Sequence, residues 1–340
     1  MEEILLSICI PTYNRVSKVL ELVKSILQYK GLNIEVVVLD NASTDETQLK
    51  LSEIHDSRLK VFTNSNNIGS MPNIIKSFSH GRGRYLMLCL DKDFIVVDYL
   101  DEFLNILCAK SDLSVGTINL NCTVASECNH FLRGSESLLQ MAYKSEHPSG
   151  LFFKKDIYHN LLLDPQKILV NESFAFNPDL IKADLLTKGN AIFVNIPLVK
   201  TEPLEECSEI ISFTYLGDNI YFSPKMIQKR VQMFMNHIIS LEIKDQIKIK
   251  LINLIFTRYL YESTIEFRKI LNDSNICNHH KLSTREVKLK ELISICLTYN
   301  FNFIKHIEIR YFIYIFPTIV ISNLKLLIRL FLKVENDKIQ

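Results

Sequence analysis

The sequence predicts an α/β fold, with a mainly parallel sheet flanked by helices, joined to a helical C-terminal region. Two observations carry this prediction. Between residues 4 and 90, short apolar runs rich in β-branched side chains alternate with segments of helical spacing. Each apolar run is followed by turn-forming or acidic residues. A run that is apolar at nearly every position is typical of a parallel strand covered on both faces.

The individual elements follow from this alternation. Strands are expected at Ile4–Ile10, Ile34–Leu39, Leu59–Thr63, Tyr85–Leu90, Ser114–Asn119 and Ala191–Ile196. Helices are expected at Val16–Tyr29, after Ser43, and at Asn73–His80, Tyr99–Ala109 and Pro178–Lys188. Beyond residue 220 the pattern is helical throughout, with helices expected at Met226–Leu241, Lys244–Ile270 and Arg285–Leu297.

Size and composition set the domain count. The chain has 340 residues, 47% of them apolar and 23% charged, which is typical of a globular protein and excludes a disordered or fibrous one. With only 9 Gly and 9 Pro, no long flexible linker is expected. We expect an α/β domain over residues 1–215 and a helical region over residues 216–340.

Polar residues gather where the first four strands end. Segments 11–14, 40–45, 64–69 and 91–93 follow these strands in turn. Sheets of this kind bind ligands outside the carboxyl ends of their strands, so we expect the four segments to share one edge. The last segment carries two carboxylates, a donor type that suits Mg²⁺ or Mn²⁺, although two acids in a loop can equally be solvated surface.

Four motifs, in this order and spacing, resemble those of family 2 glycosyltransferases with the GT-A fold. They are SICIPTYNR at 7–15, EVVVLDNASTDET at 35–47, NNIGSMPN at 66–73 and GRYLMLCLDKD at 83–93. The resemblance is close over residues 5–100 and looser over 145–200, and the bacterial transferases that build O-antigen and capsule repeats form the most similar subgroup. It implies a nucleotide diphosphate sugar donor, with a UDP-sugar favoured, and a glycan or lipid-linked acceptor.

The resemblance also implies roles in nucleotide binding. Pro11 and Tyr13 would line the pocket for the base, and Asp40 would accept a hydrogen bond from it. Asn67 would shape the backbone near the nucleotide. Each has a plainer explanation as well, because prolines end strands and Asp and Asn are common in turns.

The D-x-D segment is the implied metal site. Asp91 would face the ribose or the donor sugar, and Asp93 would ligate Mg²⁺ or Mn²⁺. The family often has three acids here, whereas this chain has Lys92 in the middle. Such an ion would neutralise the diphosphate and help it leave.

The catalytic base is less clearly marked. The family inverts the anomeric centre, which implies a carboxylate that deprotonates the acceptor hydroxyl. It often lies in a Glu-Asp pair at the start of a helix, and here that pair is replaced by Asn177-Pro178. Asp179 is the nearest acid and the leading candidate, with Glu172 second. An acid in the first turn of a helix is also explained by the helix dipole alone.

The C-terminal region is basic and apolar. Residues 221–340 hold 19 Lys and Arg against 10 Asp and Glu, whereas the preceding 220 residues hold 20 against 28. Within 310–334, a proline and two polar residues interrupt an otherwise apolar stretch, and Lys325, Arg329 and Lys333 recur every four residues. This pattern predicts an amphipathic helix on an anionic membrane surface. Packing on the catalytic domain or in a homo-oligomer would explain it too. Nucleic acid binding is not expected, because no binding module is recognisable.

The sequence also bears on the location of the protein in the cell and on two alternative functions. The eight cysteines form no C-x-x-C pair and the acidic start resembles no export signal, so we expect a cytoplasmic protein, peripheral on the cytoplasmic face of the inner membrane. A sugar-nucleotide nucleotidyltransferase is one alternative, although its Gly-rich loop is missing after the first strand. A GT-A scaffold without activity is another, suggested by the missing acidic pair.

Overall fold

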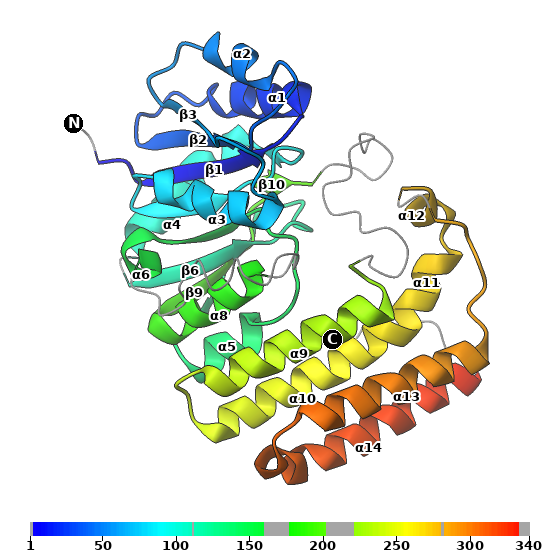
Figure 1. Cartoon of the computed structure of the whole chain (residues 1–340). Coiled ribbons are helices and arrows are strands. Elements are labelled where there is room, and N and C mark those ends of the chain that lie inside the picture. The colour runs from blue at the N-terminus through cyan, green and yellow to red at the C-terminus, as the bar shows by residue number, and fades with distance from the viewer. Residues whose placement is uncertain (1–2, 111, 160–176, 202–220, 280–281, 333–340) are drawn as a thin grey trace. The chain divides into compact units, whose positions relative to one another are not determined.

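The computed structural model describes residues 3–110, 112–159, 177–201, 221–279 and 282–332 (Figure 1). The chain divides into two compact units, Met1–Glu202 and Pro203–Gln340, which we call unit 1 and unit 2. The domain boundary expected at residue 215 lies outside the described residues.

Unit 1 is built on an eight-stranded sheet with the order β3-β2-β1-β4-β8-β6-β9-β7. Its strands are β1 (Leu6–Thr12), β2 (Ile34–Asp40), β3 (Leu59–Thr63), β4 (Tyr85–Leu88), β6 (Leu113–Ile118), β7 (Asn129–Phe131), β8 (Leu151–Lys154) and β9 (Asn190–Val194). A separate antiparallel ribbon pairs β5 (Phe94–Ile95) with β10 (Val199–Lys200).

The direction of each strand decides which loops meet. Strands β1 to β4 are mutually parallel, so β1, β2 and β4 end at one edge. Strand β8 runs antiparallel between β4 and β6, and therefore begins at that same edge. The loop that precedes β8 is thus brought beside the ends of the parallel strands.

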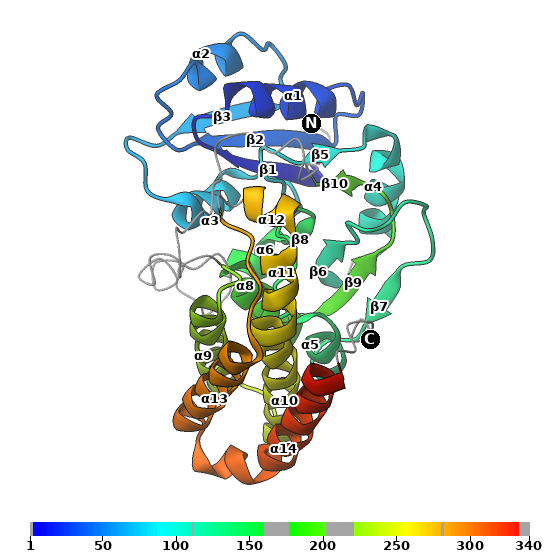
Figure 2. The same cartoon turned by 90° about the vertical axis from the view of Figure 1, so that its right-hand side faces the viewer.

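Helices cover both faces of the sheet (Figures 1 and 2). Helices α1 (Val16–Ile26) and α4 (Leu100–Ala109) share one apolar core with the strands, in which Leu6, Ile8 and Ile10 of β1 point toward them. On the opposite face lie α3 (Ser70–His80), α6 (Lys155–His159) and α8 (Asn177–Lys188). The short helices α2 (Thr47–Ser52) and α5 (Ser135–Met141) complete the unit. The predicted α/β fold is confirmed.

Unit 2 is helical, as the sequence predicts. It contains α9 (Pro224–Ser240), α10 (Asp245–Tyr261), α11 (Phe267–Asn272), α12 (Ser274–His279), α13 (Leu289–His306) and α14 (Ile309–Leu332). A π-helical turn, Glu262–Glu266, joins α10 to α11, so the helix expected over Lys244–Ile270 is continuous. Buried aromatic rings hold the helices together, and the Tyr299 hydroxyl donates to the Phe256 carbonyl at 3.0 Å.

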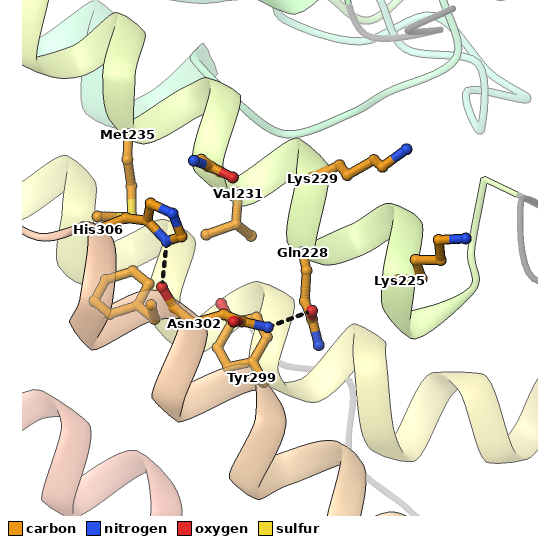
Figure 3. Close-up of a pocket in the computed structure, with 10 residues that line it drawn as sticks. Lys225, Gln228, Lys229, Val231, Met235, Tyr299, Asn302 and His306 are labelled. Atoms are coloured by element: carbon orange, nitrogen blue, oxygen red, sulfur yellow. Dashed lines mark hydrogen bonds between the residues drawn. The ribbon is translucent and has the colours of Figure 1, made fainter.

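A small cavity opens between α9 and α13 within unit 2 (Figure 3). Its volume is about 250 Å³, and its wall includes Lys225 and Lys229 from α9 and His306 from α13. The Asn302 amide donates to Gln228 at 2.7 Å across it. The cavity marks the side of α13 that faces α9.

Candidate functional site

The ends of β1 and β2 are locked together in register. Thr12 lies opposite Asp40 in the parallel pair, and the amide of Asn41 donates to the Thr12 carbonyl at 2.9 Å. The amide of Asn64, just after β3, donates to the Asp40 carbonyl at 2.9 Å. Three of the four predicted segments are therefore joined by backbone hydrogen bonds at this edge of the sheet.

Asp91 ties the fourth segment to the first. Its carboxylate accepts from the Thr12 hydroxyl at 2.8 Å and from the Arg15 guanidinium at 2.7 Å. Burial raises the pKa of Asp91, while the charge and hydrogen bond of Arg15 act in the opposite direction. Each carboxylate oxygen has a second lone pair that can accept a further hydrogen bond. The expected contact of Asp91 with the ribose or sugar stays a prediction.

Asp40 is fully buried inside its own loop. Its carboxylate accepts from the backbone amide and the hydroxyl of Ser43, and from the Gln48 amide at 2.9 Å. This arrangement closes a tight turn after β2. The proposed hydrogen bond from a base to Asp40 stays a prediction.

Two residues in left-handed backbone conformations shape the loops after β1 and β2. Asn14 has φ 51° and Ala42 has φ 60°. Non-glycine residues adopt this conformation at a cost, and it recurs at functional sites. The side-chain oxygen of Asn14 accepts a hydrogen bond from the backbone amide of Thr44 at 2.7 Å, which holds the two loops side by side.

Pro11 and Tyr13 occupy different environments. Pro11 is buried within β1, opposite Leu39. The Tyr13 side chain is 37% exposed at the edge of the sheet. Of these two, only Tyr13 presents a large ring to solvent, where an incoming base could stack on it.

Asn67 is held by Asn41, a residue that the sequence analysis did not single out. The Asn41 side chain donates to Asn67 at 2.8 Å and accepts from the Asn64 side chain at 3.0 Å. Gly69, at φ 90°, donates its amide to Asn67 at 2.9 Å. Asn41 is 2% exposed, so it organises the loops after β2 and β3 from inside. Its place directly after Asp40 was the signal available in the sequence.

Asp93 faces the loop that precedes β8. Its carboxylate is 1% exposed, accepts from the Ser149 hydroxyl and lies 3.5 Å from Nε2 of His147. Ser149 in turn accepts from the Leu90 amide at 2.9 Å. Burial lowers the pKa of His147, and Asp93 opposes that shift. His147 is a second residue that the sequence analysis did not assign to the site.

The same loop reaches the predicted base. The amide of Ser145 donates to the Asp179 carboxylate at 3.1 Å, and the Lys182 ammonium lies 3.9 Å from that carboxylate. Asp179 is 5% exposed in the first turn of α8. The structure thus brings Asp179 and Asp93 to opposite ends of the 145–149 loop, with no direct bond between them among the described residues. Glu172 lies outside the described residues.

The oxygen donors at this edge fit a hard divalent cation. Across the described ranges, no three His, Cys, Asp or Glu side chains lie close enough to form a complete metal site. Mg²⁺ is commonly held by one or two carboxylates, with the remaining positions filled by substrate phosphates and water. Asp93, buried at the strand end with Asp91 two residues before it, matches that donor set.

Comparison with known proteins gives the family. The family described as Glycosyl transferase family 2 matches residues 7–155. The chain is 33% identical over 95 residues to the Escherichia coli UDP-Glc:alpha-D-GlcNAc-diphosphoundecaprenol beta-1,3-glucosyltransferase WfgD, covering 28% of this chain and 37% of that protein. It is 32% identical over 114 residues to the abequosyltransferase RfbV of Salmonella typhimurium, covering 32% and 34%. The chain therefore spans about a third of the length of these two relatives.

Longer matches have lower identity. The putative colanic acid biosynthesis glycosyl transferase WcaA of Escherichia coli is 24% identical over 242 residues, which cover 68% of this chain and 81% of WcaA.

Solved structures agree on the fold of the chain. TarS 1–349 from S. aureus has a TM-score of 0.61 at 13% identity, covering 94% of this chain and 88% of TarS 1–349. Its complex with UDP-GlcNAc has a TM-score of 0.62 at 14% identity, covering 94% and 89%. These likenesses confirm the predicted GT-A fold with a helical C-terminal region. The predicted resemblance to family 2 glycosyltransferases is confirmed by the family match over residues 7–155, from β1 to β8.

Proposed function

We propose that the protein transfers a sugar from a nucleotide diphosphate sugar to a hydroxyl of a glycan during cell-surface polysaccharide synthesis. The observation that carries this proposal is the position of Asp93 within the family 2 domain, between the end of β4 and the loop before β8. The loops after β1, β2 and β3 are bonded together at the same edge of the sheet. A nucleotide diphosphate laid across that edge would reach all four.

The donor and acceptor classes are inferred from similar proteins. The name of WfgD includes a UDP-sugar and a diphosphoundecaprenol acceptor, and TarS is solved with UDP-GlcNAc. We therefore favour a UDP-sugar and a lipid-linked acceptor for this chain. Such an acceptor would place the protein on the cytoplasmic face of the inner membrane.

The reaction that we propose is a single displacement with inversion. The acceptor oxygen attacks the anomeric carbon, the bond from that carbon to the diphosphate oxygen breaks, and the hydroxyl proton passes to a carboxylate. Asp179 is the proposed base, held at the start of α8 by its bond from Ser145. Tyr13 and Asp40 would bind the base of the nucleotide, with Pro11 beneath them and Asn67 shaping the neighbouring loop.

The leaving diphosphate needs positive charge. Bound Mg²⁺ or Mn²⁺ would supply it, since such ions stabilise the negative charge that develops on a leaving phosphate. Asp93 would hold the ion, and the Ser149 hydroxyl and the nearby His147 ring fix the orientation of the Asp93 carboxylate. Asp91 would contact the ribose or sugar while Arg15 and Thr12 keep it in place.

Release of nucleoside diphosphate from a panel of nucleotide sugars, with Mn²⁺ or Mg²⁺ and a membrane extract as the acceptor source, tests this function. We expect turnover with one nucleotide class and a loss of at least 100-fold in Asp93→Asn. Glu53→Gln is the matched control, because Glu53 is an exposed acid of the same unit and forms an ion pair with Lys50 at 3.1 Å. Equal turnover by the wild type and Asp93→Asn would refute the assignment of Asp93 to the metal.

A further inference from the structure

Unit 2 exposes large apolar side chains on its last two helices. On α14, Ile309, Ile313 and Leu324 are 77%, 70% and 54% exposed. On α13, Leu297 and Phe301 are 66% and 69% exposed. Single exposed apolar residues are ordinary on protein surfaces, but several on neighbouring helices form a patch that calls for a partner.

The exposed residues of the two helices belong to one face. Asn300 of α13 and Asn323 of α14 exchange side-chain hydrogen bonds of 2.8 Å in both directions, which fixes where the helices touch. Leu297, Phe301 and Ile304 lie on the outer side of that contact on α13, by helical periodicity. On α14 the outer side carries the remaining exposed apolar residues. We call this surface the apolar face; it comprises Leu297, Phe301, Ile304, Ile309, Ile313, Tyr314, Phe316, Val320, Ile321, Leu324, Leu327 and Ile328.

Exposed lysines border the apolar face. Lys290 lies on the same side of α13 two turns before Leu297, Lys305 follows Ile304, and Lys325 lies beside Leu324 on α14. Helix α14 contains no acidic residue. Glu291 of α13 and Glu308 before α14 are each paired with an arginine, at 2.7 Å and 2.6 Å, so the lysines give the rim a positive charge. Of the basic residues expected to form a stripe, Arg329 instead stacks over the Tyr261 ring at 5.1 Å, and Lys333 lies outside the described residues.

The inner side of α14 is bonded into unit 2. The Tyr311 hydroxyl donates to Asp245 at 2.9 Å, and Ser322 and Thr257 share a hydrogen bond of 3.0 Å. By length and composition α14 could cross a membrane over Ile309–Leu330, the one helix in the described part of the chain for which this holds. A spanning α14 would have to give up these polar partners inside hydrocarbon, where unpaired polar groups are costly.

We propose that unit 2 docks in the plane of an anionic lipid leaflet through the apolar face, with its lysine rim on the headgroups. The face offers an apolar surface to the acyl region and positive charge at its border, which is the combination that interfacial helices use. Lysines near an anionic leaflet are attracted by its negative surface potential. The inference stands on unit 2 alone and does not depend on sugar transfer by unit 1.

Charge favours a leaflet over a second copy of the chain. In a symmetric dimer the same patch meets itself, so the lysine rims of the two copies would face each other. Like charges juxtaposed across an interface oppose association. An anionic leaflet meets the same rim with opposite charge.

Flotation of the full chain with phospholipid vesicles tests the proposal. We expect the wild type to float with vesicles of phosphatidylcholine containing 30% phosphatidylglycerol, and much less with phosphatidylcholine alone. Ile313→Gln together with Leu324→Gln should lower the bound fraction at least tenfold, since both side chains are exposed in the middle of the apolar face. Lys305→Glu with Lys325→Glu should weaken flotation with the anionic vesicles.

The control pair is Lys225→Glu with Lys229→Glu. It reverses two charges at the cavity on the α9 side (Figure 3), away from the apolar face, so flotation should be unchanged. Circular dichroism should show every variant folded, because all the altered side chains are on the surface.

Several outcomes would overturn the proposal. One is a wild type that fails to float with anionic vesicles, and another is flotation unaffected by the glutamine pair. Retention in the vesicles after an alkaline carbonate wash would indicate a spanning α14 instead. A dimer in solution that the glutamine pair dissociates, without flotation, would identify a second copy as the occupant.

Discussion

At the residue scale, the site is held together by polar contacts between residues that are distant in the chain. Arg15 ends the first motif, yet its role as the buried partner of Asp91 arises only because β1 and β4 are neighbours in the sheet. Asn41 and His147 also act through partners distant in the chain. The motif residues could be predicted because family resemblance is local in sequence, whereas their supporting contacts depend on strand order.

The Arg15–Asp91 pair gives a prediction about stability. Arg15→Met leaves a buried carboxylate without its counter-charge, and breaking a buried pair in this way costs about 3–5 kcal/mol. Burial then raises the pKa of Asp91 in the folded state further above its unfolded value. The loss of unfolding free energy in Arg15→Met, relative to the wild type, should thus be small below about pH 4 and grow as the pH rises. Urea unfolding followed by circular dichroism at several pH values measures it.

The double variant Arg15→Met with Asp91→Asn is the control for that measurement. Because it removes both charges, it should regain part of the lost stability and show little dependence on pH. If the loss of unfolding free energy in Arg15→Met stays the same from pH 4 to pH 8, it does not arise from the charge on Asp91.

At the element scale, the strands with long apolar runs could be predicted and the shorter ones could not. Strands β1 to β4 each begin within two residues of their expected positions. Strand β8 has four residues, of which Lys154 is charged, and it pairs antiparallel between β4 and β6. Local pattern does not encode this long-range insertion. Its consequence is large, because it delivers the 145–149 loop to Asp93.

Helix α13 differs from its prediction for a similar reason. The expected helix ran from Arg285 to Leu297, whereas α13 runs from Leu289 to His306. The polar residues Asn300 and Asn302 interrupt the apolar spacing, but each forms a side-chain hydrogen bond to a neighbouring helix. Half-buried amides that find partners are compatible with a packed helix, and a sequence alone does not reveal the partners.

Gly150, where the 145–149 loop enters β8, allows a test of this element. Its φ is 83°, and an added Cβ would lie 2.8 Å from Cβ of Ile118. Gly150→Ala should therefore lower the free energy of unfolding by about 1–3 kcal/mol through backbone strain and by about 1–3 kcal/mol more through overpacking. Gly134→Ala is the matched control, since Gly134 has φ 93° with nothing within 4 Å of the added atom. Equal losses of unfolding free energy in the two variants would contradict the close packing at Ile118.

At the scale of the whole molecule, the fold class and the two-part organisation of the chain could be predicted from the sequence, whereas the substrates could not. The acidic first part and basic last part of the chain correspond to an α/β unit with carboxylates at its strand ends and a helical unit with exposed lysines. Donor sugar and acceptor could not be predicted, because selectivity depends on the shape of the pocket, which is set by loops far apart in sequence.

Ligand binding should stabilise these loops in a defined pattern. A ligand that binds only the closed form of a loop raises the free energy of local opening by RT ln(1 + [L]/Kd), which is about 2.7 kcal/mol at 100 times Kd. With UDP and Mn²⁺ at saturation, we expect slower amide hydrogen exchange in peptides covering residues 40–45 and 143–150, since both loops border the proposed site. Peptides covering β7, at the far end of the sheet order, provide the internal reference, and Asp93→Asn should abolish the effect. Protection confined to other segments would show that the nucleotide binds elsewhere on the molecule. Protection of the two loops that survives in Asp93→Asn with Mn²⁺ present would show that Asp93 is not needed to hold the nucleotide.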